Sequence, residues 1–448
     1  MLTTDVLGER MAGPAIRAYQ IALDLSADHD VTLASTAACD LGTHDFRCFK
    51  VNGSALKALV AGADLVIFQG FITDRHPWLL RTDKILIADL YDPIHLEQLE
   101  QMRARPAAER RNAVDATVRL LNEQLARADF IMCASEGQRT LWLGQLAALG
   151  RINPDTYDDD SSLRSLIAVC PFGVPSEPAR RTAPAIRDVV PGIGGDDKVI
   201  IWAGGVYNWF DPETLIKAVD RLRKTRPKVR LFFLGMQHPN PAVPEMRAAA
   251  QARRLADELG LTGVHVFYNE GWVRYDDRQN YLLDADVGVS THFVHLETTF
   301  SFRTRILDYL WVGLPVVATV GDAFEALNDV RQFGIAIPEC DVEALAAALD
   351  TVLFDTAAAG RFAANSRATG EMLRWPQALS PLREFCARAE RAPDAGPTQQ
   401  RLLRRPAGAR TAAGRRLVRA RDMAREGRLP DVWREILRRF VSLVRRVG

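Results

Sequence analysis

Short runs of β-branched and other apolar residues alternate along most of the chain with longer amphipathic stretches. This alternation is typical of βαβ units, in which a crossover helix joins two parallel strands. The sequence therefore predicts an α/β fold built on doubly wound parallel sheets. The predicted strands are 30–35, 46–51, 64–68, 84–90, 129–135 and 166–171 in the first half, and 198–204, 229–235, 263–268, 286–291, 315–320 and 333–338 in the second.

The strand pattern restarts after a stretch rich in proline and arginine, which divides the chain into similar halves. We expect an N-terminal Rossmann-like domain at 1–178, a linker at 179–196, a second Rossmann-like domain at 197–390, and a basic linker with an amphipathic helix at 391–448. Two such domains facing one another place a ligand in the cleft at the carboxyl ends of their strands. The predicted helices are 15–27, 94–127, 136–149, 212–224, 246–259, 276–283, 302–312 and 342–354.

The start of the first domain departs from this pattern. A buried strand normally precedes the first glycine loop of such a domain, but only residues 1–10 stand before the segment Met11–Arg17. Either the domain lacks its first strand, or the sequence starts downstream of the true start. Of the two, we favour the second.

The net charge of +1 hides a strong asymmetry along the chain. Residues 401–448 contain 15 arginines and 4 acidic residues, whereas the rest of the chain contains 42 basic and 52 acidic residues. This basic tail on an acidic body suggests an anionic partner for the tail.

Cysteine usage and hydropathy indicate a reduced, cytoplasmic compartment. The 6 cysteines include no CxxC pair, so the sequence indicates neither a disulfide framework nor a zinc site. The N-terminal segment has no apolar stretch typical of a secretory signal, and no run is long and apolar enough to span a membrane.

Residues 295–322 carry the most informative motif. They predict a loop, then a helix, and then a turn into a buried strand. The helix N-terminus near Thr304 offers unpaired N–H groups and a positive dipole, which suit an anion. Arg303 and Arg305 flank it with guanidinium groups suited to phosphate, and Asp308 stands one turn further, where it can accept hydrogen bonds from a ribose. The alternative is an amphipathic helix whose arginines are merely solvated.

This segment resembles the C-terminal donor-binding motif of retaining glycosyltransferases of family 4, which have the GT-B fold. Phe302 matches the aromatic position of the motif, Asp308 stands at the second of its two glutamates, and 313–319 match its Gly-x-Pro-Val-Val-Ala-Thr turn. Phe300 occupies the position of the first glutamate, so the nearest acid is Glu297. The resemblance implies that Asp308 contacts the nucleotide ribose and that Glu297 contacts the donor sugar.

Two glycine-containing segments are similar to the family's phosphate loops. Gly13 opens the first helix and allows close backbone approach, although a Gly-Pro pair at a helix start also forms a simple turn. Gly204 and Gly205 end a predicted strand where the family begins its second loop. The Arg and Lys expected after that loop are replaced by 206–211, so Arg303 and Arg305 are candidates to substitute for them. The predicted donor-binding residues are Gly13, Arg17, Gly204, Gly205, Arg303, Thr304, Arg305 and Asp308.

The predicted catalytic residues are Asp92 and Glu297. Asp92 follows the strand 84–90, where the family has a His-Asp pair facing the reacting sugar, and Tyr91 stands at the histidine position. The alternative for Asp92 is a cap at the start of the next helix. We expect no metal and no cofactor, because the histidines are dispersed and the Asp284-Ala285-Asp286 triplet begins a core strand.

The predicted tail helix, 431–447, carries apolar residues on one face and five arginines on the other. Such a helix suits an anionic lipid surface; alternatively it docks on the protein itself or on a second copy. Together these features predict a retaining glycosyltransferase that uses a nucleotide-diphosphate sugar and a lipid-linked or membrane-proximal glycan acceptor of cell-surface polysaccharide synthesis, on the inner face of the membrane and without nucleic acid. The alternatives are another GT-B enzyme with a soluble substrate, or a non-catalytic sugar-nucleotide-binding or scaffold protein.

Overall fold

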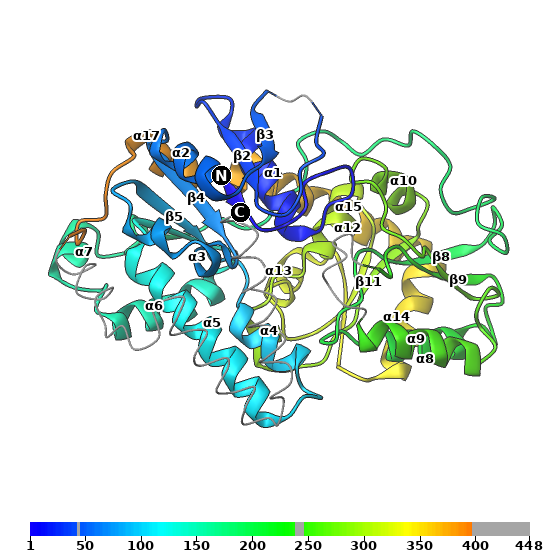
Figure 1. The fold of residues 1–448 in the computed structure, drawn as a ribbon. Coiled ribbons are helices and arrows are strands. Elements are labelled where there is room, and N and C mark those ends of the chain that lie inside the picture. The colour runs from blue at the N-terminus through cyan, green and yellow to red at the C-terminus, as the bar shows by residue number, and fades with distance from the viewer. Residues whose placement is uncertain (43–44, 238–245, 397–448) are drawn as a thin grey trace, which may run out of the picture. The chain divides into compact units, whose positions relative to one another are not determined.

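A computed structural model describes residues 1–42, 45–237 and 246–396. Two sheets organise these residues (Figure 1). The seven-stranded sheet has the order β3-β2-β1-β4-β5-β6-β7, and the six-stranded sheet has the order β10-β9-β8-β11-β12-β13. All pairs in both sheets are parallel, which confirms the predicted fold class of two Rossmann-like domains. The basic tail after residue 396, with its predicted helix at 431–447, lies outside the described residues.

The first domain contains every strand predicted for it. Its strands are β1 (Leu2–Thr3), β2 (Thr32–Ser35), β3 (Arg47–Lys50), β4 (Leu65–Gln69), β5 (Ile85–Asp89), β6 (Phe130–Cys133) and β7 (Ile167–Val169). Its helices are α1 (Gly13–Leu25), α2 (Gly53–Ala61), α3 (Ile72–Arg75), the 3-10 helix η1 (Pro77–Arg81), α4 (Ile94–Gln101), α5 (Ala107–Arg127), α6 (Glu136–Leu149) and α7 (Pro154–Asp159). Helices on both faces bury the central strands, and all four residues of β6 are buried.

Strand β1 corrects the expectation that the first strand is missing. It has only two residues, both buried, and lies between β2 and β4 in the middle of the sheet. Leu2 is in register with Ala34 on one side and Phe68 on the other. A two-residue strand has no hydrophobic run to recognise, because its neighbours in the sheet rather than its own length stabilise it.

The single helix predicted at 94–127 is wrong in detail, because the structure contains two helices there. Helix α4 ends at Gln101, and α5 begins at Ala107 after Pro106. Proline lacks the backbone N–H, and it disfavours helical backbone in the residue before it. The chain therefore turns at Pro106 instead of continuing one long helix.

The second domain also contains all of its predicted strands. These are β8 (Lys198–Trp202), β9 (Val229–Phe233), β10 (Val266–Tyr268), β11 (Val287–Ser290), β12 (Val316–Thr319) and β13 (Gly334–Ile337). Its helices are α8 (Pro212–Leu222), α9 (Arg247–Glu258), α10 (Arg278–Leu283), α11 (Leu296–Phe300), α12 (Thr304–Val312), α13 (Glu325–Arg331), α14 (Val342–Phe354) and α15 (Thr356–Met372).

Tyr309 places helix α12 against the second sheet. Its hydroxyl accepts a hydrogen bond from the Ala203 backbone N–H and donates one to the Val289 carbonyl, each at 2.9 Å. Gly288 of β11 makes room for the ring, because a Cβ there would come within 2.3 Å of it. The helix then ends at Gly313, whose φ of +73° suits a residue without a side chain.

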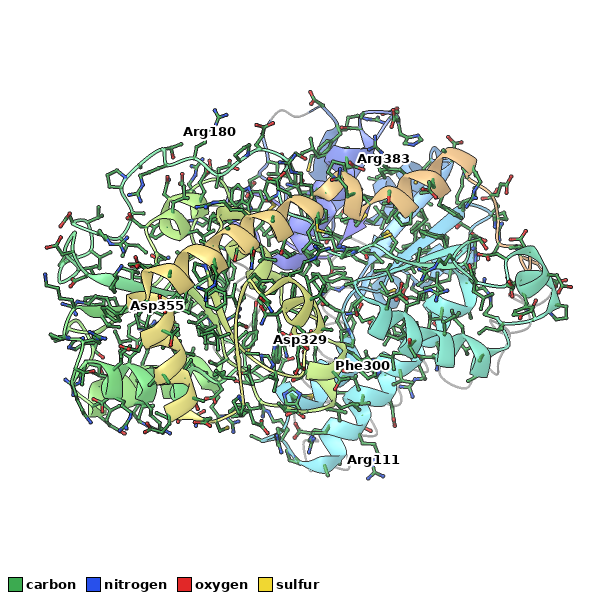
Figure 2. The ribbon with its side chains drawn as sticks, turned by 180° about the vertical axis from the view of Figure 1, so that it is seen from behind. Arg111, Arg180, Phe300, Asp329, Asp355 and Arg383 are labelled. Atoms are coloured by element: carbon green, nitrogen blue, oxygen red, sulfur yellow. The ribbon has the colours of Figure 1, made fainter. Side chains whose placement is uncertain are left out.

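The end of the described chain returns to the first domain. Helices α16 (Trp375–Ala378) and α17 (Ser380–Arg388) follow α15, and Figure 2 shows the run of helices from Asp355 to Arg383. The Trp375 backbone N–H donates to the Val174 carbonyl at 3.0 Å, and Phe385 stacks on Phe130 with ring centroids 4.5 Å apart. These last helices therefore pack against the first domain, although the prediction places all residues up to 390 in the second. An apolar helix face does not reveal which sheet it covers.

The linker 179–196 contains no helix or strand and is held by the second domain. The Asp284 carboxylate accepts hydrogen bonds from backbone N–H groups of the linker, including that of Ile186 at 2.8 Å. Asp286 forms an ion pair with Arg187 of the linker. The Asp284-Ala285-Asp286 triplet therefore has the structural role that the sequence predicts.

Candidate active site

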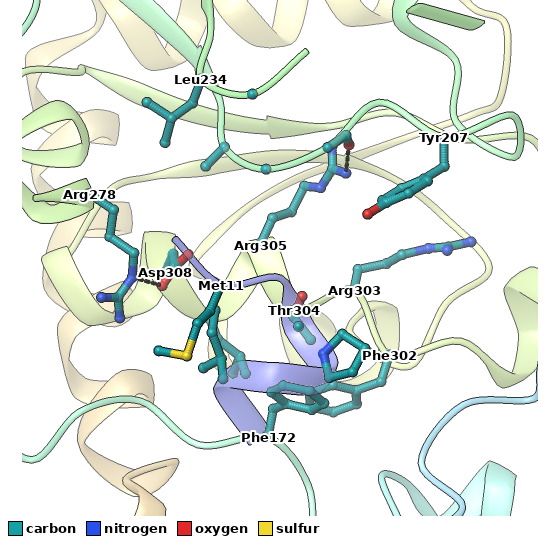
Figure 3. A pocket seen from close by; sticks show the side chains of 18 of the residues that line it. Met11, Phe172, Tyr207, Leu234, Arg278, Phe302, Arg303, Thr304, Arg305 and Asp308 are labelled. Carbon is teal, nitrogen blue, oxygen red and sulfur yellow. Dashed lines mark hydrogen bonds and ion pairs between the residues drawn. The ribbon is translucent and has the colours of Figure 1, made fainter. Parts of the chain in front are cut away.

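A cavity of about 340 Å³ lies between the two domains, at the carboxyl ends of their strands. Figure 3 shows it from close by. Contacts across its rim join the domains: Trp272 Nε1 donates to the Met11 carbonyl at 3.0 Å, and Gln20 Nε2 donates to the Tyr275 hydroxyl at 3.1 Å. The cavity lies where an open α/β fold places its ligands.

Three of the predicted glycines line this cavity: Gly13, Gly204 and Gly205. Gly204 follows β8 with a φ of +97°, a left-handed conformation that favours glycine. No heavy atom lies within 4 Å of the place where its Cβ would stand, so the backbone there is open to close approach.

Helix α12 presents its N-terminus to the cavity. Thr304, its first residue, lines the cavity, and Arg303 stands at the N-cap position. The N-cap side chain makes no capping hydrogen bond to the first turn, and no acidic residue lies within that turn. The first amides of the helix are therefore suited to an anion supplied by a ligand.

Arg305 is a buried cation of the cavity wall without a carboxylate partner. Its Nη2 donates to the Gly205 carbonyl at 2.8 Å, and its guanidinium lies 3.9 Å from the ring centroid of Phe210. Its side chain is buried, and its Nη1 has no hydrogen-bond partner. Burial lowers the pKa of Arg305 to about 10. Within the described part of the cavity wall, it is the cation that forms no ion pair with a carboxylate.

Arg303 differs from Arg305, because its charge is already neutralised. Both of its Nη atoms donate to the two carboxylate oxygens of Glu297, at 3.0 and 2.8 Å. The side chain of Glu297 is fully buried on α11 and does not line the cavity. The structure therefore does not bring Glu297 to the place predicted for it. A carboxylate buried this deeply requires a counter-ion, which Arg303 supplies.

The structure also keeps Arg17 away from the cavity. Its side chain is fully buried in α1, and its Nε and Nη2 both donate to Asp89 at the end of β5. Further hydrogen bonds reach the carbonyls of Cys170 and Pro171. Arg17 thus ties α1 to the ends of two strands, and the prediction that it binds donor missed Asp89 as its partner.

Asp308 lines the cavity as predicted, together with a cation that the sequence analysis missed. Its Oδ1 accepts a hydrogen bond from Arg278 Nε at 3.1 Å. The Arg278 guanidinium lies 3.8 Å from the ring centroid of Tyr275 and 4.6 Å from that of Trp311. The feature of the sequence that could have indicated Arg278 as a site residue is its position at the start of the predicted helix 276–283.

The first domain contributes two acids to the cavity, Asp92 and Glu97. Burial raises the pKa of Asp92 to about 7, even though a hydrogen bond with Tyr91 opposes the shift. Burial and the neighbouring charges of Asp92 and Glu297 raise the pKa of Glu97 well above its usual value. Pro93 rather than Asp92 holds the N-cap position of α4, so the alternative role of Asp92 as a cap is wrong. Glu97 was missed, although it lies in the first turn of a predicted helix after a strand end.

Within the described ranges, no three His, Cys, Asp or Glu side chains converge in a way that could hold a metal ion. The same residues include no helix with the length and apolar character that crossing a membrane requires.

Residues 197–355 match the protein family described as glycosyl transferases group 1. Sucrose-phosphate synthase from Thermosynechococcus elongatus has a similar structure, with a TM-score of 0.62 and 17% identity over 86% of this chain and 98% of that one. Anabaena HepE in complex with UDP-glucose has a TM-score of 0.61 and 15% identity over 86% and 99%. WaaG, a glycosyltransferase involved in lipopolysaccharide biosynthesis, has a TM-score of 0.57 and 16% identity over 86% and 97%. None of the curated proteins compared with the chain matches it.

These structures and the two facing Rossmann-like domains define the chain as a GT-B protein. The matched region contains Gly204, Arg305 and Asp308, so the family match covers one wall of the cavity. The similar structures, at 15–17% identity, show the GT-B fold, and the match to glycosyl transferases group 1 covers most of the second domain.

Proposed function

We propose that the cavity binds a nucleoside-diphosphate sugar with its diphosphate at the N-terminus of α12 and at Arg305. The observation that carries this proposal is the buried guanidinium of Arg305, which faces the cavity without a carboxylate partner. A diphosphate would supply the missing anion. Gly204 and Gly205 lie beside it, where backbone groups can approach phosphate oxygens.

The remaining donor contacts follow from this placement. Asp308 would accept hydrogen bonds from the ribose while Arg278 holds its carboxylate in place. Gly13, at the start of α1, would approach the diphosphate from the opposite domain. The complex of HepE with UDP-glucose supports uridine as the first base to test.

The transfer would proceed with retention of the anomeric configuration, as in the family that the chain resembles. Arg305 and the α12 amides would stabilise the leaving diphosphate as the glycosidic bond breaks. The acceptor hydroxyl would attack from the same face, and the departing phosphate oxygen would take its proton. Asp92 lies in the opposite wall, where it would contact a reacting sugar, and Glu297 would act only by holding Arg303.

We further propose a lipid-linked or membrane-proximal glycan as the acceptor, with the protein peripheral on the inner face of the membrane. The 15 arginines of residues 401–448 support this assignment, as does the role of WaaG in lipopolysaccharide biosynthesis. A soluble phosphorylated acceptor is the alternative. It would need a second unpaired cation, whereas Arg303 and Arg278 are both paired with carboxylates within the described cavity wall.

Calorimetric titration of the full-length protein with UDP, GDP, ADP and TDP tests the donor site. We expect one nucleotide to bind, and Arg305→Gln to weaken its binding by about 1.5–3 kcal/mol, the usual contribution of a charged hydrogen bond. Arg254→Gln removes an exposed arginine from α9 and is the matched control. Unchanged nucleotide binding by Arg305→Gln would contradict the assignment, and binding of no nucleotide would overturn the donor site as a whole.

A further inference from the structure

The first domain lines the cavity with carboxyl groups that have no counter-ion. Asp92 and Glu97 both line it, and neither forms an ion pair among the described residues. The nearby cation, Arg303, gives both of its Nη atoms to Glu297. The cavity therefore has an unpaired cation on one wall and two unpaired acids on the other.

Aromatic rings lie beside these acids. Tyr207 and Trp209 line the cavity, and their rings stack with centroids 4.9 Å apart and an interplanar angle of 6°. The charges of Asp92 and Glu97 act on the Tyr207 phenol and contribute to raising its pKa, although burial is the larger cause. The acids and this aromatic pair all line the cavity.

Unpartnered donors on the opposite wall show independently that the cavity is built for a polar ligand. Arg305 Nη1 and Arg303 Nε are buried without a hydrogen-bond partner, and both side chains are more than nine-tenths buried. Figure 3 shows both arginines beside Tyr207. A diphosphate would satisfy the donors of this wall and would leave Asp92 and Glu97 for the other substrate.

We infer that the acceptor carries a protonated amine, as an amino sugar does, and that the amine binds between Asp92, Glu97 and the aromatic faces of Tyr207 and Trp209. An ammonium group is attracted both by carboxylates and by the faces of aromatic rings. The hydroxyl group of a neutral sugar makes a hydrogen bond but leaves the charge of the acids uncompensated. This inference rests on the proposed function, because it assigns the part of the cavity that the donor does not occupy.

The titration behaviour of the two acids agrees with this geometry. Desolvation raises the pKa of both half-buried acids, and the charge of Asp92 raises that of Glu97 further, so that without a cation the pair retains a proton. Asp89 and Glu297 add further negative charge, whereas Arg17 and Arg303 oppose them. With that proton the pair carries one negative charge, which a bound ammonium would neutralise.

Two probes of matched shape test the inference: methyl glucosaminide and methyl glucoside, which differ in one amino group. Each is titrated at pH 7 into the full-length protein saturated with the nucleotide that it binds. Tryptophan fluorescence is the readout, because Trp209 and Trp272 line the cavity. We expect the amino compound to bind at least about tenfold more tightly, as a charged hydrogen bond implies.

Glu97→Gln and Asp92→Asn keep the side-chain shape and remove the charge, and each should abolish most of this preference. Glu109→Gln on the exposed start of α5 is the matched control and should retain it. Equal binding of the two probes, tighter binding of the glucoside, binding of neither, or a preference that both variants keep would overturn the inference. If the donor site is wrong, the protein binds no nucleotide. If only this inference is wrong, nucleotide binding persists.

Discussion

The two walls of the cavity carry opposite unpaired charges. In the second domain, Arg305 has no carboxylate partner, although Arg303 two residues earlier is held by Glu297. In the first domain, Asp92 and Glu97 have no cation, although Asp89 three residues before Asp92 is held by Arg17. In each domain, therefore, unpaired charged groups of the cavity wall lie close in the sequence to a residue of a buried ion pair.

Charged groups in ion pairs contribute to stability, whereas unpaired charged groups are available for binding. A buried ion pair holds two elements together, and it has little attraction left for a ligand. A buried charge without a partner destabilises the empty protein and is available to a ligand of opposite charge. We therefore expect substitutions in the pairs to change the free energy of unfolding, and substitutions of the unpaired groups to change binding.

The largest expected effect compares Arg17→Met with Arg305→Met. Arg17→Met leaves Asp89 buried without a partner, so it should lower the free energy of unfolding by about 3–5 kcal/mol. Arg305→Met strands no carboxylate and should change it by less than about 1 kcal/mol. Urea denaturation measures both values. The double variant Arg17→Met/Asp89→Leu should recover most of the loss, and equal losses in the two single variants would break the comparison.

A smaller effect is expected at Gly204, where a substitution should affect both stability and nucleotide binding. Gly204→Ala places a side chain at a φ of +97° and should lower the free energy of unfolding by about 1–2 kcal/mol. Its added Cβ also points into open space at the cavity, so nucleotide binding should weaken. Gly263→Ala is the control, since its φ of +73° and open surroundings are similar but it lies outside the cavity. It should lose stability and keep its nucleotide affinity; the same affinity loss in both variants would contradict the role of Gly204.

The smallest expected effect is a pH dependence at Asp92. Its pKa in the folded protein is about 7, raised from 3.8, so the folded state holds this proton to a higher pH than the unfolded state does. Stability contributed by the group is therefore lost as the pH rises from about 4 to 7. Asp92→Asn cannot ionise. Its melting temperature relative to that of the unsubstituted protein should therefore increase over this range and remain constant at higher pH. Asp115→Asn on the exposed face of α5 controls for the lost charge, and a gain independent of pH would contradict the shift.

Apart from the two-residue β1, the strands of both sheets could be predicted from the sequence because burial on two faces requires continuous apolar runs, such as Phe130–Cys133 in β6. The helix–turn–strand motif at α12 and β12 was also visible, since the dipole of a helix and the turn at Gly313 depend on neighbouring residues only. These local signals placed the glycines, Thr304, Arg305 and Asp308 in one site.

Pairing over long distances in the sequence could not be predicted in this way. Arg17 and Asp89 are 72 residues apart, and no local pattern joins them. The same holds for Arg151 and Asp394, 243 residues apart, whose buried ion pair ties the end of the described chain to the first domain. For this reason, the sequence predicts that Arg17 binds the donor and extends the second domain to residue 390.

The sequence by itself determined the two parallel sheets, the cavity at their carboxyl ends and the residues of the α12 motif, because hydrophobic periodicity and local backbone rules specify them. The tertiary structure alone decided which of these charges stay available to a ligand. Arg303 and Arg305 are the same residue type at the same helix start, yet packing gives one a carboxylate and leaves the other beside a carbonyl and aromatic rings. Whether a charge is neutralised depends on what the fold brings within a few ångströms, which its neighbours in the sequence do not specify.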